Sequence, residues 1–132
     1  MADRLEARAK SFNKIASDKA VAATLVTLNV LYERTPVDTS AAVSNWQVSL
    51  NSPISGFISP YVPGFLGYTA SASIAIAKQV AIGILQNKKP GQVIYITNNA
   101  PYIRGLNSGT SKQDPGGFVE AAALIARKSL AN

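Results

Sequence analysis

Between residues 35 and 77 the chain carries a single charged side chain, that of Asp38. Part of this stretch, residues 52–70, mixes Gly, Pro and Ser with aromatic side chains, which excludes one continuous helix or strand. The aromatic content is also too high for a flexible linker. A long ordered segment of this kind is uncommon within a domain and is usually functional. Its composition resembles that of interface cores, which are enriched in aromatic residues and depleted in charge.

Two interpretations of residues 52–70 stay open. The segment either contacts a neighbouring subunit or folds back over the core of its own chain. In the first case it is an extended interface loop on a single domain that spans residues 1–132. The aromatic candidates for subunit contact are Phe57, Tyr61, Phe65 and Tyr68.

Residues 2–33 contain neither Gly nor Pro, and their apolar side chains recur at spacings of seven, three and four. This pattern predicts one long helix. The helix ends before Pro36, because the residue preceding a proline is pushed out of the α region. The first half is amphipathic, with charges on its outer face and Leu5, Phe12 and Ile15 opposite them.

The second half of this helix is apolar nearly all round, which predicts burial on more than one side. Leu25 and Leu28 lie in this half and are further candidates for subunit contact.

The remaining pattern predicts a small sheet and two further main helices. Trp46, Val48 and Leu50 alternate with polar residues as in a half-buried strand, and residues 93–97 are the strongest strand signal. Residues 70–87 and 118–130 have helical periodicity, and Pro101 opens a short helix. The fold class is α+β, with an antiparallel sheet of two to four strands. The inward-facing residues are expected to be Ile74, Val80 or Ala81, and Leu85 in the second helix, and Phe118, Ala121 or Ala122, Ile125 and Leu130 in the last.

Several residues have structural interpretations. Asp38 can cap the amides of the turn that follows it. Trp46 is interpreted as a core anchor, with an interface position as the alternative. Asn98 and Asn99 are expected to satisfy the backbone of their own turn. Tyr102 and Phe118 are expected to attach the connection between residues 98 and 118 to the core.

The net charge is +6, and residues 78–132 hold seven basic and two acidic side chains. A surplus of this size serves solubility or faces nucleic acid, which attracts Lys and Arg without base recognition. Aromatic and basic residues do not alternate as in RNA-binding modules, which argues against sequence-specific recognition. Arg104 and Lys112 are the best candidates for DNA contact.

The residues give little support for catalysis. The chain lacks both Cys and His, which excludes thiolate nucleophiles, cysteine-ligated metals and histidine acid–base chemistry. The stretch from Gly105 to Lys112 has the wrong residue order for a phosphate-binding loop. Each acidic side chain has a structural explanation in a helix, cap or turn. We therefore expect no enzymatic activity and no cofactor.

The N-terminus is dense in charge and has no apolar stretch behind it that a signal peptidase would recognise. The longest nearly uncharged helical runs fall short of the roughly 18 residues that a membrane span requires. We therefore expect a soluble protein made in the cytoplasm that does not enter a membrane.

Two segments resemble a known family. The first is the turn Thr35-Pro36-Val37-Asp38-Thr39, followed by Trp46. The second runs from Ile94-Tyr95-Ile96-Thr97-Asn98-Asn99-Ala100-Pro101-Tyr102 through Leu106-Asn107-Ser108-Gly109-Thr110-Ser111-Lys112-Gln113 to Pro115-Gly116-Gly117-Phe118-Val119. Together they are similar to the neck and tail-completion proteins of tailed bacteriophages, which are minor virion proteins at the head–tail junction. The second segment is the more specific of the two.

The chain departs from that family at two positions. Ser40 stands where the turn usually has glycine, and Val43 stands where a basic residue is common. If the glycine serves a left-handed backbone position, Ser40 either adopts it at an energetic cost or the turn differs. The missing base would weaken an inherited contact with DNA or a neighbouring subunit.

The resemblance implies a homo-oligomeric, hexameric ring in the virion, assembled in the bacterial cytoplasm. Such a ring joins a portal-side head–tail adaptor protein to the tail tube or a tail-terminator protein, and double-stranded DNA passes through its lumen. A tail-terminator or head-closure ring is the first alternative. A cytoplasmic, non-specific DNA-binding module is the second.

Overall fold

The computed structural model describes residues 2–36, 40–64, 67–109 and 116–131. The predicted α+β class, with a long N-terminal helix, a small antiparallel sheet, a second helix and a C-terminal helix, is confirmed. Within the described residues the sheet has two strands. The elements are α1 (Ala2–Arg34), α2 (Ala41–Ser44), β1 (Gln47–Leu50), α3 (Ala70–Leu85), β2 (Ile94–Thr97), α4 (Ile103–Asn107) and α5 (Phe118–Ala131).

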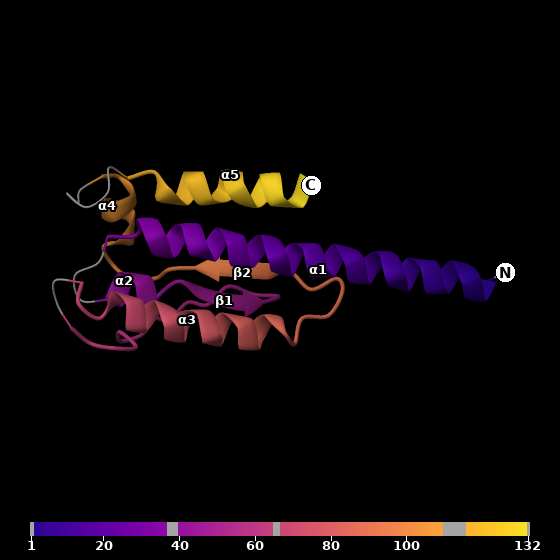
Figure 1. Cartoon of the computed structure of the whole chain (residues 1–132), viewed down its shortest axis with the longest axis horizontal. Helices are drawn as coiled ribbons and strands as arrows, with labels where there is room; N and C mark the ends of the chain where they lie inside the picture. The colour runs from indigo at the N-terminus through magenta and orange to yellow at the C-terminus, as the bar shows by residue number, and fades with distance from the viewer. Residues whose placement is uncertain (1, 37–39, 65–66, 110–115, 132) are drawn as a thin grey trace.

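Helix α1 runs through the middle of the molecule (Figure 1). Helix α5 packs antiparallel along one side of α1, while the sheet and α3 lie on the other side. Strands β1 and β2 pair antiparallel, from Gln47 opposite Thr97 to Leu50 opposite Ile94. The N-terminal part of α1 extends well beyond every other element (Figure 1).

The core lies where α1, β1, α3 and the first turns of α5 meet. At its centre the rings of Trp46 and Phe118 pack edge to face, with centroids 6.4 Å apart and planes at 88°. Phe118 is fully buried and Trp46 is 7% exposed. The other buried members of this cluster are Leu28, Leu31, Tyr32, Val48, Ala77, Ala81, Leu85 and Ala122.

Small side chains on α3 face the core, which corrects the predicted inner face. The buried row is Ser73, Ala77, Ala81 and Leu85, spaced four residues apart, whereas Val80 is 43% exposed. Small residues let the helix approach the sheet closely. The burial of Ala81 and Leu85 agrees with the prediction, while Ile74 only borders the core.

Two apolar faces are only partly covered, because the core is shorter than the helices that border it. On α5 the predicted burial of Phe118 and Ala122 is confirmed and Ile125 is half-buried, whereas the prediction for Leu130 is wrong, since it is 51% exposed. On α1 the apolar side chains of the first half meet no core. Leu5, Phe12 and Ile15 are 62%, 71% and 57% exposed.

The turn after α1 contains a strained residue. Ser40 has a φ of 69° and a ψ of 5°, so it does adopt the left-handed conformation that favours glycine. Its buried hydroxyl shares a hydrogen bond of 2.8 Å with the hydroxyl of Thr69, which offsets part of the backbone cost. Pro36 is buried directly after the helix end, and the predicted cap Asp38 lies outside the described residues.

Candidate interaction surfaces

The irregular segment 52–64 is fixed to its own chain by two asparagine side chains. Asn45 is fully buried; its Nδ2 donates to the carbonyl of Ile58 at 2.9 Å, and its Oδ1 accepts from the Ile58 N–H at 2.8 Å. The Nδ2 of Asn99 donates to the carbonyl of Ile54 at 2.7 Å. These amides replace the strand pairing that the segment lacks, so its backbone is held without regular secondary structure.

Serine hydroxyls continue this attachment where the segment crosses α2 and α3. Ser44 Oγ accepts a hydrogen bond from the N–H of Tyr61 at 3.1 Å. Ser73 Oγ accepts from the N–H of Val62 at 3.0 Å and donates to the Val62 carbonyl at 3.2 Å. Both serines are fully buried, so these polar side chains serve the interior of the molecule and not its surface.

The structure separates the predicted interface residues. Phe57 and Tyr68 are exposed, at 50% and 81% of their surface. Tyr61 is half-buried and packs against the core, as does Leu25. Leu28 is 1% exposed and belongs to the core, so its assignment to a subunit contact is corrected. Phe65 lies outside the described residues.

A second apolar surface lies between α1 and α3. An open groove of about 390 Å³ runs there, and Val21, Leu25 and Ile82 are among its lining residues. Ile82 is 42% exposed in this groove. Ile82 was not among the predicted residues, although helical spacing places it beside the buried row of α3, next to Leu85.

Asn107 joins the end of α4 to the start of α5. Its Oδ1 accepts from the N–H of Val119 at 3.0 Å, and its Nδ2 donates to both carboxylate oxygens of Glu120 at 3.1 Å. The Asn107 side chain therefore caps α5. Tyr102, expected to attach this connection to the core, is 43% exposed, and Ile103 and Leu106 make the core contacts of α4.

Asn98 and Asn99 have different roles. Asn98 Oδ1 accepts from the N–H of Ala100 at 3.0 Å, as expected for a residue that satisfies its own turn. Its Nδ2 also donates to the carbonyl of Ala42 at 2.8 Å and connects the turn to α2. Asn99 instead binds the distant segment around Ile54.

The two motifs that carry the family resemblance meet in space. The indole N–H of Trp46 donates to the hydroxyl of Thr35 at 2.8 Å, and the ring packs against Phe118. The guanidinium of Arg34 donates from Nη2 to the carbonyl of Gly116 at 2.9 Å. Residues more than 80 positions apart in the chain thus share one framework.

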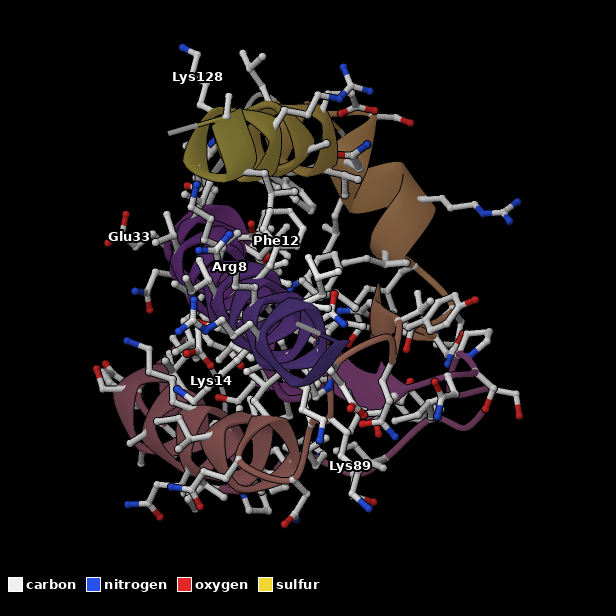
Figure 2. All side chains as sticks on the ribbon, turned by 90° about the vertical axis from the view of Figure 1, so that its right-hand side faces the viewer. Arg8, Phe12, Lys14, Glu33, Lys89 and Lys128 are labelled. Carbon is white, nitrogen blue, oxygen red and sulfur yellow. The ribbon has the colours of Figure 1, made fainter. Side chains whose placement is uncertain are left out.

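The two residues predicted to contact DNA are not brought together. Arg104 is exposed on α4, whereas Lys112 lies outside the described residues. Contact with DNA therefore stays a prediction for both. Other basic side chains are exposed on α1, including Arg8 and Lys14, which point in different directions (Figure 2).

Tyr32 is the clearest unsatisfied polar group of the described core. Its ring is 3% exposed, and its buried hydroxyl has no hydrogen-bond partner among the described residues. The pKa of Tyr32 is raised from 10 to about 12. The main cause is burial of the hydroxyl, and the second is the charge of Tyr61 when that side chain is ionised.

We expect Tyr32→Phe to raise the free energy of unfolding by about 1 kcal/mol at neutral pH, because it removes a buried hydroxyl without a partner. In alkali the unfolded tyrosine ionises near pH 10 and the folded one near pH 12. The wild type therefore loses about 2 to 3 kcal/mol of stability between these values, and the variant does not lose this contribution. Urea unfolding across this pH range measures the difference, and parallel profiles would contradict the prediction.

Among the described residues, no three acidic side chains lie close enough together to hold a metal ion. No helix in the described part of the chain is long and apolar enough to cross a membrane. Comparison with protein-family models, with curated proteins and with solved structures finds no match.

Proposed function

We propose that this chain is a structural subunit of a tailed-bacteriophage neck, where it forms a ring adaptor at the head–tail junction. The supporting observation is that both motifs of the resemblance converge on Trp46, through its bond to Thr35 and its packing on Phe118. When residues are shared within a family because they stabilise its fold, they are expected to contact one another in the structure, as these do. In this role the subunit assembles as a hexamer in the virion and needs no cofactor.

Ring closure requires two different surfaces on each subunit. The first is the exposed side of the segment around residues 52–70, represented by Phe57 and Tyr68. The second is the groove between α1 and α3, where Ile82 is 42% exposed. Large exposed apolar side chains such as these are typical of surfaces that a partner covers.

In the ring, one rim binds the portal-side adaptor protein and the other binds the tail tube or a tail terminator. Double-stranded DNA passes through the lumen, and exposed basic side chains such as Arg104 face its phosphates without reading sequence. Such contacts let DNA slide past, because non-specific contacts with phosphates exchange readily.

We expect the double variant Phe57→Asp and Tyr68→Asp to abolish ring formation while the subunit stays folded. Both side chains are at least half exposed, so two carboxylates there cost little in the monomer and much in an apolar contact. Native mass measurement is the readout, with six times 13.9 kDa expected for a single wild-type ring and twice that mass for two paired rings.

The matched control is Ser55→Asp with Ser71→Asp, which adds the same charge at exposed polar positions of the same region. The control is expected to assemble like the wild type. An unchanged oligomer in the Phe57 and Tyr68 variant would exclude this surface from the ring. Antibody labelling of intact phage particles away from the head–tail junction would contradict the proposed location.

A further inference from the structure

The N-terminal arm, defined as residues 4–16 of α1, has every side chain exposed. It is about 20 Å long at the helical rise of 1.5 Å per residue. Figure 1 shows that it projects away from all the other elements. A helix of this length without packing is marginal in water, and it exposes Phe12 at 71% and Leu5 at 62%. The arm therefore lacks a partner within the described part of its own chain.

The apolar residues of the arm form one straight stripe. Leu5, Ala9, Phe12 and Ala16 follow each other at spacings of four, three and four, which places them on one face of the helix. The same face continues into the body of the molecule at Ala23, which is 4% exposed.

Helix α5 covers this face only where it continues into the body. Ala20 and Ala23 of α1 line a groove of about 400 Å³ together with Ala126 and Leu130 of α5. Phe12 points to the side of α1 on which α5 lies, and Lys14 points the other way (Figure 2). The arm thus extends a face that already packs against an antiparallel helix, but α5 ends before reaching it.

We propose that the arm packs antiparallel against the arm of a second copy of this chain. The partner's arm then covers the face of α1 beyond the point where α5 ends. In this arrangement Leu5 of one copy lies opposite Ala16 of the other, and Ala9 lies opposite Phe12. Each large side chain meets a small one, so the two surfaces interdigitate without voids. A parallel pair would instead place Phe12 on Phe12 and Ala9 on Ala9.

The charges beside the stripe agree with antiparallel pairing. Glu6 and Asn13 flank it on one side, and Arg8 and Ile15 flank it on the other. With the arms antiparallel, Glu6 faces Asn13 and Arg8 faces Ile15, so no like charges meet in the middle of the seam, although the same offset brings Arg4 near Lys19 at its two ends.

The partner arm also begins close to where α5 ends. The positive N-terminal end of one helix therefore follows the negative C-terminal end of another, which is a favourable alignment of dipoles. This inference does not depend on the proposed neck function, because it uses a surface separate from residues 52–70.

The first test is the mass of Phe12→Asp compared with that of Ser11→Asp. Both variants add one carboxylate to the exposed arm, but Ser11 lies off the stripe. We expect Phe12→Asp to halve the mass of the wild-type assembly, from dimer to monomer or from paired rings to a single ring. The Ser11 variant should keep the wild-type mass. A wild-type monomer, or an unchanged mass in the Phe12 variant, would overturn the proposal.

The second test uses the absence of native cysteine. On mixing, Leu5→Cys and Ala16→Cys are expected to form a disulfide between the two variants under mild oxidation. Leu5→Cys alone should not cross-link, because its two copies lie about 16 Å apart along the helices and a disulfide needs Cα atoms within about 7 Å. Efficient cross-linking of Leu5→Cys alone would indicate a parallel pair and contradict the register.

The arm is also basic, with Arg4, Arg8, Lys10 and Lys14 against Glu6. Duplex DNA and vesicles of anionic lipid are therefore the probes for other occupants of the stripe. Pairing of the arms predicts that Phe12→Asp and Ser11→Asp bind both probes equally weakly. Loss of binding to either probe in the Phe12 variant alone, with a monomeric wild type, would assign the stripe to that probe and overturn the proposal.

Discussion

Replacing Trp46 with alanine is expected to lower the free energy of unfolding by about 3 to 5 kcal/mol. The indole is 7% exposed and packs edge to face on Phe118, which brings β1 and α5 together. Its N–H donates to the hydroxyl of Thr35 at the end of α1. The substitution therefore leaves a cavity at the point where three elements meet, and a buried hydroxyl loses a partner.

Two controls separate these contributions. Trp46→Phe keeps an aromatic ring against Phe118 but removes the N–H, so a smaller loss of about 1 to 2 kcal/mol is expected. In the monomeric subunit, Tyr68→Ala removes an aromatic side chain that is 81% exposed and should change stability by less than about 0.5 kcal/mol. Chemical unfolding followed by circular dichroism measures all three. A loss below about 1 kcal/mol for Trp46→Ala would show that the indole does not support the core.

Hydrophobic periodicity was sufficient to predict the elements of this fold. The long helix, both strands and the two later helices follow from spacing and from the prolines that interrupt it. The sequence also indicated the strained turn, because Ser40 stands where the family that the chain resembles usually has glycine, and Ser40 adopts the positive φ. Local patterns predict these features because they depend on residues close together in the chain.

Which part of a helix face is covered could not be predicted in the same way. The stripe of α1 has a similar spacing at Phe12 and at Ala23, yet Phe12 is exposed and Ala23 is buried. The difference depends on where α5 ends, and that is a property of tertiary packing. The sequence pattern of α3 favours large side chains such as Ile74 on the inner face, whereas the helix approaches the sheet closely through small ones such as Ser73 and Ala77.

The side-chain hydrogen bonds that hold segment 52–64 could not be predicted from the sequence either. No motif around Asn45 indicates a structural role, although its side chain is fully buried and binds a residue 13 positions away. Asn99 was assigned to its own turn because asparagine commonly serves turns, but it binds the carbonyl of Ile54. Long-range side-chain to backbone bonds leave no periodic signal.

Asn45→Asp is expected to lower the free energy of unfolding by about 3 kcal/mol or more at neutral pH, although it changes a single atom. The Nδ2 of Asn45 donates to the carbonyl oxygens of Ala41 at 2.8 Å and Ile58 at 2.9 Å. A carboxylate oxygen in that place would face two carbonyl oxygens with no hydrogen between them. The Oδ1 bond from the Ile58 N–H would persist, so the loss isolates the donor side of the amide.

The pH dependence of this variant distinguishes charge from packing. Burial and the two carbonyls raise the pKa of the introduced carboxyl in the folded state, so the folded chain takes up a proton more readily than the unfolded one. The destabilisation should therefore shrink as the pH falls toward the ordinary carboxyl pKa, where the protonated acid donates to one of the carbonyls. Asn45→Ala, which lacks the charge, should lose about 2 to 3 kcal/mol relative to wild type at every pH. If the Asp and Ala variants instead respond alike to acid, the Asn45 amide is not the donor that holds segment 52–64 in place.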